Sequence, residues 1–460
     1  MSSAGTSTTT SVLHGSEAPR RLEHAPLPPT LPRARGSALL ALATAGAAGL
    51  GFGYDARLAA LAFAALVVAA VMLLRLEWAA LLVVTTAVFE DYLSVVTPWA
   101  TKGVAVVLIG SWVVRRGWRP LHRGERSPVL VVAGGFTLVL LASAVLHNNG
   151  AAGADVVLRY AGFLAVLAVL VDTMRAGLPP QVVARAYVAS CALASCFAVA
   201  EFWTGDDRRA GGPIGDPNDF AFFLLAAIPL ALVLRGSARR RWVYDVAAGL
   251  LVVTTALTLS RGALVGAVAM VVVGAVLRLI PLRTIAVGLV AAGTLAAVVA
   301  GTVPDLVSTS LERKSVVAEQ NVDERLDLWQ AATSMTRENP VLGMGPGSFS
   351  LYHQDYMDRL PRDISHDLDV AHNTYLEVSS ELGFVGLATW FVLLATGALS
   401  AWVGAKRRGD ALAGAVLLAL VGLAVASAFV TEQYVLPIWL VLALAATLQR
   451  PPPSTATVLR

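Results

Sequence analysis

Long apolar runs alternate with short polar stretches along most of this chain. Each run has roughly 16–22 residues and almost no charge. At 1.5 Å of rise per residue, a helix of 18 or more apolar residues spans a hydrocarbon core of about 30 Å. Within lipid every backbone polar group must find its partner inside the segment, so these runs are predicted to be α-helices. They lack the ten-residue alternation of an outer-membrane β-barrel.

The spacing of the runs predicts about fourteen membrane-spanning helices, eleven before a long polar stretch and three after it. The predicted fold class is an all-α polytopic membrane protein with about 12–14 transmembrane helices and one large outer-face loop. The expected spans lie at 37–53, 58–75, 78–96, 101–115, 128–146, 156–174, 183–203, 218–235, 242–259, 262–280, 284–303, 380–403, 411–430 and 433–449.

The polar stretches divide the chain into five segments. The first 36 residues are rich in Ser, Thr and Pro and lack the early apolar core and cleavage site of a signal peptide, which favours a disordered cytosolic tail. We expect that tail at 1–36, transmembrane helices over 37–303, a large extracytoplasmic loop with short helices at 304–372, the last three transmembrane helices over 373–449 and a second cytosolic tail at 450–460.

The distribution of Lys and Arg predicts the orientation. If the N-terminus is cytosolic, 23 of the 35 basic residues fall in cytosolic loops and tails, whereas the short outer loops hold six. This bias is the one that membrane insertion produces. The loop 304–372 therefore faces outward, and both termini are expected in the cytosol. A bacterial cytoplasmic membrane is the predicted location.

The remaining composition fits this topology. Hydrophobic residues make up 56% of the chain and charged residues 14%, against about 25% charged in soluble domains. The net charge of +4 is explained by the cytosolic loops, so no nucleic-acid partner is expected. Cys191 and Cys196 lie in one apolar run and are interpreted as buried small hydrophobes, with a disulfide or metal pair as the alternative.

Ser260, Arg261 and Gly262 form the first outward-facing candidate motif, between two apolar spans. An arginine is costly inside the bilayer, so Arg261 must snorkel to the interface or face a polar cavity. It is either an interfacial anchor or a phosphate ligand, because the guanidinium fork matches phosphate oxygens.

Arg325 lies in the second motif, at the start of a predicted short helix in the long outer loop. Asp323 is a plausible N-cap, Leu326, Trp329 and Ala332 share one face, and Asn339-Pro340 ends the helix. Arg325 either pairs on the surface with Glu324 or Asp327, or has a functional role.

The glycine-rich segment 343–347 lacks the Gly-Lys-Ser/Thr ending and the preceding strand of a nucleotide-binding loop. We interpret it as a turn that lets the chain lie close to the membrane.

His372 stands where the long loop returns to the membrane. Histidine is the side chain best suited to accept a proton near neutral pH. His353 and His366 are also predicted to face outward, but His372 lies at the mouth of the helix bundle. Asp367 and Asp369 leave open a metal site with a histidine, although loop carboxylates are usually solvated.

Asp216 and Asn218 open the span that follows the outer loop 204–217. Either side chain can cap that helix. The positive N-terminal end of the helix would also favour a nearby anion, which makes both residues candidate substrate ligands.

The order of these motifs resembles that of the O-antigen ligase and polymerase family. The resemblance rests on Ser260-Arg261-Gly262 at a span boundary, Arg325 four residues before Trp329, Asn339-Pro340, the segment 343–349 and His372-Asn373-Thr374-Tyr375. It covers roughly 200–440 in detail. Eleven spans precede the long loop, more than the roughly nine expected of the ligases.

This resemblance implies a GT-C-like membrane glycosyltransferase that needs no metal or other cofactor. The implied donor is a glycan on undecaprenyl diphosphate, and the acceptor is a hydroxyl of a glycan, lipid or protein. Arg261 and Arg325 would hold the diphosphate, His372 would be the general base, and Asn373 and Tyr375 would contact substrate. An inverting single displacement is the implied mechanism.

Two other functions remain open. The first is transport of a small anion such as bicarbonate, which favours polar residues near span midpoints. The spans are nearly free of charge there, although Glu90 and Asp91 lie late in the third span and face a possible outer cavity. The second is a non-catalytic scaffold for polysaccharide assembly, in which Arg261, Arg325 and His372 would be dispensable.

Overall fold

A computed structural model describes 71–73, 75–95, 97, 99–116, 127–204, 209–280, 324–359 and 370–448. All of these residues belong to the compact unit Ala69–Arg460. The predicted tails, the span 37–53, most of 58–75, the span 284–303 and the loop residues 304–323 lie outside the described residues.

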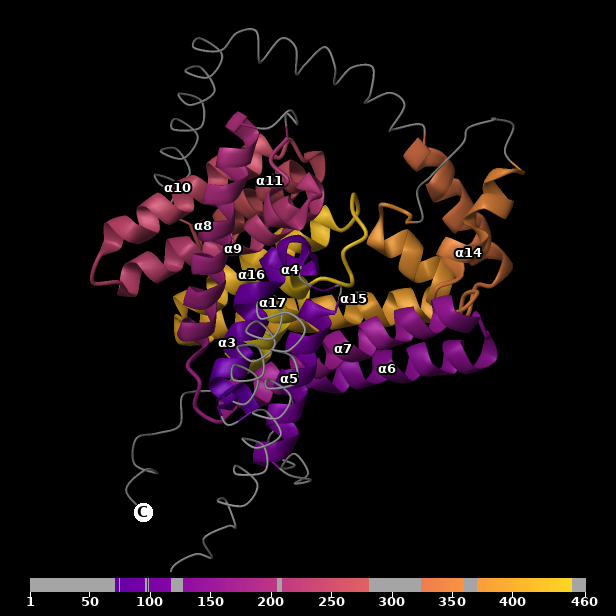
Figure 1. The fold of residues 1–460 in the computed structure, drawn as a ribbon, viewed down its shortest axis with the longest axis horizontal. Helices are drawn as coiled ribbons and strands as arrows, with labels where there is room; N and C mark the ends of the chain where they lie inside the picture. The colour runs from indigo at the N-terminus through magenta and orange to yellow at the C-terminus, as the bar shows by residue number, and fades with distance from the viewer. Residues whose placement is uncertain are drawn as a thin grey trace, which may run out of the picture. The chain divides into compact units, whose positions relative to one another are not determined.

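The described residues form helices joined by turns (Figure 1), as an all-α polytopic membrane protein requires. Within them, five helices are long and apolar enough to cross a membrane, namely α6, α7, α8, α9 and α15, and α11, α16 and α17 are shorter and apolar. The helices are α3 (Leu76–Thr86), η1 (Ala87–Phe89), α4 (Glu90–Ser94), α5 (Ala100–Arg116), α6 (Pro128–Leu146), α7 (Gly150–Arg175), α8 (Pro180–Thr204), η3 (Gly212–Ile214), α9 (Pro217–Ser237), α10 (Arg241–Leu257), α11 (Arg261–Val276), an unlabelled helix at 324–338, α14 (Ser348–Met357), α15 (Thr374–Arg408), α16 (Ala411–Ala426) and α17 (Leu436–Thr447).

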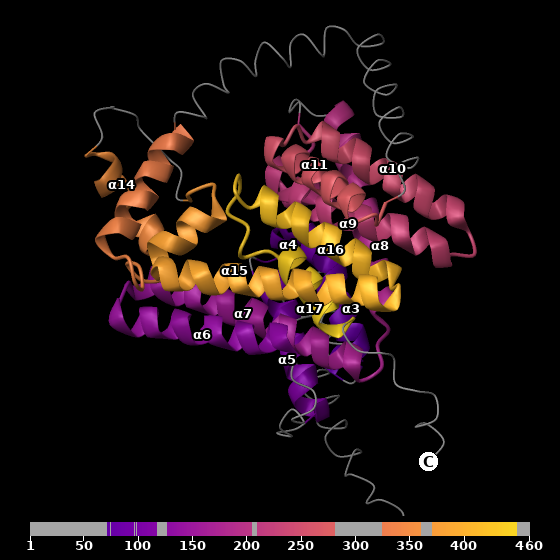
Figure 2. The same cartoon turned by 180° about the vertical axis from the view of Figure 1, so that it is seen from behind.

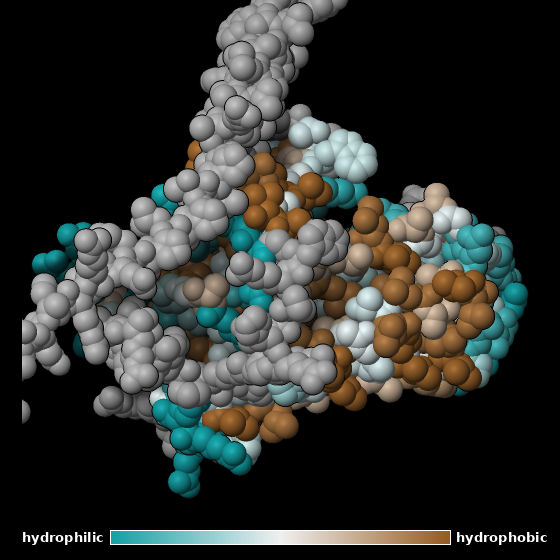
Figure 3. Space-filling view, turned by 90° about the horizontal axis from the view of Figure 1, so that it is seen from below, coloured by the Kyte–Doolittle hydropathy of each residue, from teal (hydrophilic) through white to brown (hydrophobic). Residues whose placement is uncertain are grey.

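Helix α6 coincides with the predicted span 128–146. It starts at Pro128, whose fixed φ suits the first helical position and whose missing N–H costs nothing there. One face packs on α15, and the other is an apolar outer surface that includes Leu138 and Val145, 70% and 83% exposed. Apolar side chains gather on this part of the molecule in Figure 3. Such a surface is suited to contact with lipid acyl chains.

The predicted span 78–96 is not one continuous helix. Helix α3 ends at Thr86, and η1 and the five-residue α4 follow. The hydroxyls of Thr85 and Thr86 bond carbonyls one turn back, which loosens the local helix, and Phe89 leaves helical geometry at φ −107° and ψ 27°. The break places Glu90 and Asp91 on a short helix of their own.

Helix α15 is longer than the predicted span 380–403 and is broken at Gly383, where φ is 66° and ψ is −170°. The segment 340–345 packs into the break. Phe384 N–H donates to Pro340 O at 2.8 Å, and Gly345 N–H donates to Glu381 O at 2.9 Å. The turn thus satisfies backbone groups that the interrupted helix leaves without partners.

The glycine-rich segment is a turn, as predicted. Gly343, Gly345 and Gly347 all have positive φ, and a Cβ at Gly343 would collide with the Glu381 backbone. Glycine is required here because an L side chain is strained at positive φ and has no room.

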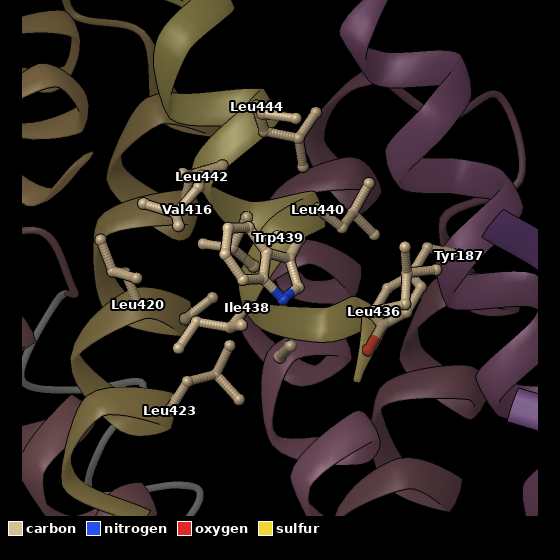
Figure 4. Close-up of a cluster of buried hydrophobic side chains, with 14 of the residues drawn as sticks. Tyr187, Val416, Leu420, Leu423, Leu436, Ile438, Trp439, Leu440, Leu442 and Leu444 are labelled. Atoms are coloured by element: carbon tan, nitrogen blue, oxygen red, sulfur yellow. The ribbon is translucent and has the colours of Figure 1, made fainter. Parts of the chain in front are cut away.

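The core lies where α17 packs between α7, α15 and α16 (Figure 2). Most residues of α17 are buried, which explains why this helix is apolar on all faces. Trp439 is fully buried among leucines of α16 and α17 (Figure 4), and its indole N–H donates to Gln433 O at 2.9 Å. That bond satisfies the one polar atom of the side chain.

A smaller core joins the helix at 324–338 to α14. Leu328, Met335 and Phe349 are buried at its centre. Of the three residues predicted to share one face, Ala332 is buried, Trp329 is half-buried and Leu326 is 42% exposed. The buried face runs through Leu328, Ala331, Ala332 and Met335. The helix ends before Asn339-Pro340, as predicted.

The two cysteines are free. Cys191 is buried, in line with the interpretation as a small hydrophobe. Cys196 is exposed on α8, so the prediction of burial was wrong for this residue. Its side chain points away from the neighbouring helices because it lies on the outer face of an apolar helix.

Candidate functional site

The candidate site is built from helix ends. The connecting loops bring together the start of α9, the end of α10, the start of α11 and the start of α15. Asp216 caps α9, since its carboxylate accepts from Asn218 N–H at 2.6 Å and Asp219 N–H at 3.1 Å. Of the two predicted caps, Asp216 is therefore the one that caps the helix.

Arg209 connects α9 to α10. Its Nε donates to Thr258 O at 3.0 Å, and its NH2 group donates to Asn218 Oδ1 at 3.1 Å. The Asn218 side chain thus orients an arginine. Arg209 was not predicted from the sequence, where its only distinguishing feature was its position in a short outer loop, in which arginines are scarce.

Arg261 is the first residue of α11. Ser260 caps the helix, with Ala263 N–H donating to Ser260 Oγ at 3.4 Å. A Cβ at Gly262 would lie 2.8 Å from Phe429 Cβ, so α11 packs tightly on the loop between α16 and α17. The exposed Arg261 side chain leaves its guanidinium available to a ligand.

Arg325 reaches the same loop from the helix at 324–338. Its Nη1 donates to Phe429 O at 3.2 Å, and the side chain is half-buried. Trp329, one turn later, donates to Ala371 O at 3.0 Å. The helix therefore places Arg325 and also fixes the residue before His372.

His372 precedes the cap of α15. Asn373 accepts from Tyr375 N–H at 3.0 Å and Leu376 N–H at 3.2 Å. His372 itself has φ 48°, a left-handed conformation that is uncommon outside glycine. This conformation turns the chain sharply between the loop and the membrane helix.

Two of the predicted substrate ligands make contacts within the protein. The Asn373 carboxamide oxygen is committed to the helix cap. The Tyr375 hydroxyl donates to Ala424 O on α16, and its ring stacks on Phe391. Both side chains thus position the start of α15.

Glu377 joins the segment before His372 to the loop 427–435. Its carboxylate accepts from Ala371 N–H at 3.0 Å, from Thr431 Oγ1 at 3.1 Å and from Gln433 Nε2 at 2.8 Å. The carboxylate is buried and held by neutral donors alone in these bonds, so each bond offsets desolvation. Glu377 was not predicted as a site residue, because a glutamate one turn inside a helix has no distinctive pattern.

The loop 427–435 contacts the start of α15. Thr374 N–H donates to Val430 O at 3.0 Å, and Glu432 N–H donates to Thr374 Oγ1 at 3.0 Å. Together with the Arg325 and Glu377 bonds, these contacts make the loop the common support of Arg325 and His372.

The charged groups of the site shift the pKa values of His372 and Arg325. Burial lowers the pKa of His372, and the positive charge of Arg325 lowers it further, against the opposite effect of Asp216 and Glu324. Burial also lowers the pKa of Arg325, with Arg209 and Arg261 acting in the same direction and Asp216 against it. Three arginines, one histidine, one aspartate and one glutamate therefore form one electrostatic cluster. His372 is neutral at neutral pH and can accept a proton.

The other predicted site residues lie elsewhere or outside the described residues. His353 is buried in the core of α14, with its Nδ1 2.9 Å from Phe349 O, so it is a structural residue. His366, Asp367 and Asp369 lie outside the described residues. Asp91 borders the site, since a Cβ at Gly215 would lie 3.7 Å from its Oδ2. Over the described ranges, no group of three His, Cys, Asp or Glu residues is arranged to hold a metal ion.

The fold and the site define an all-helical, multi-pass membrane protein with a charged site where its helix ends meet. A model of the O-antigen ligase family matches residues 246–391, which include Arg261, Arg325 and His372. This match confirms the resemblance seen in the sequence and supports a membrane enzyme of polysaccharide assembly, with a glycosyltransferase-like ligase activity. No curated protein matches the chain.

Proposed function

We propose that this protein transfers a glycan from undecaprenyl diphosphate to an acceptor hydroxyl at the outer face of the cytoplasmic membrane, and thereby polymerises or ligates cell-surface polysaccharide. The observation that supports this most directly is the shared electrostatic cluster of Arg209, Arg261, Arg325 and His372. Cationic groups suit a diphosphate, and a neutral histidine beside them suits a hydroxyl that must lose its proton.

The arginines act on the leaving group. As the bond between the anomeric carbon and the phosphate oxygen breaks, its electron pair stays on the diphosphate and negative charge grows there. Guanidinium groups that are already in place stabilise this charge without reorganisation, and stabilisation of this kind often contributes more to catalysis than any other effect. Arg209 and Arg325 are held by carbonyl and amide oxygens rather than by carboxylates in their hydrogen bonds, so their charge remains available to an anion.

His372 acts on the acceptor. Its neutral imidazole takes the proton of the acceptor hydroxyl while the oxygen forms its bond to the anomeric carbon. One displacement inverts the anomeric configuration. Arg325 has a second effect, because its positive charge opposes protonation of His372 before the acceptor arrives. No metal ion or cofactor enters this scheme.

Glycan analysis of cells tests the proposal. The strains carry the wild type, His372→Ala, Arg325→Lys or no copy of the gene. We expect both variants to behave like the deletion, because alanine removes the base and lysine lacks the bidentate fork. Short undecaprenyl-linked units would accumulate if the protein is a polymerase, and long lipid-linked chains if it is a ligase.

His147→Ala is the matched histidine control. Its ring nitrogen lies 3.2 Å from Ser143 O of its own helix, away from the arginine cluster, so polysaccharide should remain normal. Wild-type polysaccharide in the His372→Ala and Arg325→Lys strains, at equal protein level, would exclude the catalytic roles and favour a transporter or a scaffold.

A further inference from the structure

A second basic site lies at the other end of helices α8, α9 and α10, which pack side by side (Figure 1). The candidate active site uses the end of α10 and the start of α9. A cavity of about 610 Å³ lies at their opposite ends, lined by Arg185, Ser237, Ala238, Arg239, Arg240, Val243 and Tyr244. Helix α9 has 21 residues, which corresponds to about 31 Å of length. The cavity and the candidate active site thus lie at opposite faces of a bilayer.

The charges of this cavity are unbalanced. Three guanidinium groups line it, and no carboxylate does. Among the described residues, Arg185, Arg239 and Arg240 have no ion-pair partner, whereas the adjacent Arg235 is paired with Asp245 at 2.5 Å. Arginines whose only role is to make a surface basic do not need to line a cavity together. Three of them around one cavity are suited to an anion with several oxygens.

The surroundings indicate that this anion is part of a lipid. On α10, Trp242 follows Arg241 directly and is 62% exposed. Val246, one turn later, is 60% exposed. Exposed tryptophan marks the headgroup level of a membrane protein, and exposed valine marks the acyl chains. The cavity therefore opens at the level of the phosphates, with apolar helix surface directly beyond it.

We propose that this cavity binds the phosphate headgroup of an anionic phospholipid. The three guanidinium groups contact the phosphate oxygens, Ser237 and Tyr244 offer hydroxyls to the headgroup, and the acyl chains lie along the exposed face of α10. Basic pockets between transmembrane helices are suited to such headgroups. The proposal is independent of the catalytic function.

Lipid retention by the purified full-length protein tests it. The protein is reconstituted in nanodiscs with phosphatidylglycerol or with phosphatidylcholine, released into detergent, and its bound lipid is measured by native mass spectrometry. We expect phosphatidylglycerol to be retained and phosphatidylcholine to be lost. In Arg185→Gln/Arg239→Gln/Arg240→Gln, retention of phosphatidylglycerol should fall about tenfold or more.

Arg241→Gln/Arg278→Gln/Arg407→Gln is the matched control. It removes the same charge from residues that do not line the cavity, and it should retain lipid like the wild type. An equal loss in both triple variants, or equal retention of both lipids by the wild type, would overturn the proposal. Displacement of the lipid by millimolar inorganic phosphate would also overturn it and assign the cavity to a free anion.

Discussion

At the scale of single residues, His372 combines three properties that a general base requires. It is half-buried, it lies beside a fixed positive charge, and the residue before it, Ala371, is held by hydrogen bonds to Trp329 and Glu377. Burial and Arg325 lower its pKa, so the neutral form is the resting form at neutral pH. The sequence showed only that a histidine stands at the mouth of the bundle.

The pH dependence of transfer follows from this environment. A base with a lowered pKa is active above that pKa, and activity is lost as the pH falls through it. Glu324 raises the pKa of His372, so Glu324→Gln should lower that pKa. The acidic limb of the profile, which is the pH range in which the transfer rate falls on acidification, should then move to lower pH. Initial rates of transfer from a lipid-linked glycan over a pH series measure the shift.

Asp355→Asn supplies the control for this series. It removes one negative charge from the exposed side of α14, outside the cluster, and should leave the acidic limb in place. An unchanged limb in Glu324→Gln would mean that the limb does not report His372.

At the scale of elements, the break in α15 is the feature that positions the helix at 324–338 and α14. Gly383 lets the helix open, and the segment 340–345 bonds to the backbone groups on both sides of the opening. Ser143 also donates to Leu342 O at 2.8 Å, so α6 holds the same turn. The turn leads directly into α14, and its position therefore determines where α14 and the helix at 324–338 rest on the bundle.

Gly383→Ala should destabilise the protein by about 2–4 kcal/mol. The new Cβ would collide with Val341 O, and the residue would be held at φ 66°. Gly134→Ala on α6 has free space within 4 Å and should leave stability unchanged or slightly higher. Thermal unfolding in detergent compares the two variants, and an equal melting temperature for Gly383→Ala and the wild type would contradict the role of the break.

At the scale of the whole molecule, basic residues gather at one set of helix ends. Arg116 pairs with Asp172 at 2.6 Å where α5 and α7 end, and Lys406 donates to Leu277 O at 2.5 Å where α15 and α11 end. These contacts gather basic residues at the ends that were predicted to be cytosolic. The candidate active site lies at the other ends of α11 and α15, where the bias in basic residues predicts the outer face.

Cysteine labelling of intact cells tests this orientation. In a Cys191→Ala/Cys196→Ala background, a cysteine at the exposed Gln330 should react with a membrane-impermeant maleimide. A cysteine at the exposed Arg407 should react only after the cells are permeabilised. The reverse pattern would place the candidate active site in the cytosol and rule out an outer-face donor.

The sequence by itself determined the class of protein. Apolar runs long enough to cross a bilayer can only be helices, because lipid offers no partner for backbone groups. The spans of α6, α9 and α16 therefore start where they were predicted, to within a residue. Arg261, Arg325 and His372 stood out as well, since charged and titratable groups at membrane boundaries are few.

Only the tertiary structure decided how those residues work together. Arg209, Glu377 and the loop 427–435 complete the site through bonds between positions far apart in the chain, such as Arg325 to Phe429 O and Glu377 to Gln433. Their local sequence is ordinary, because a buried hydrogen-bond network depends on three-dimensional neighbours rather than on periodicity. The break at Gly383 was not predicted from the sequence for the same reason. The backbone groups at the break are satisfied by the turn at 340–345, far earlier in the chain.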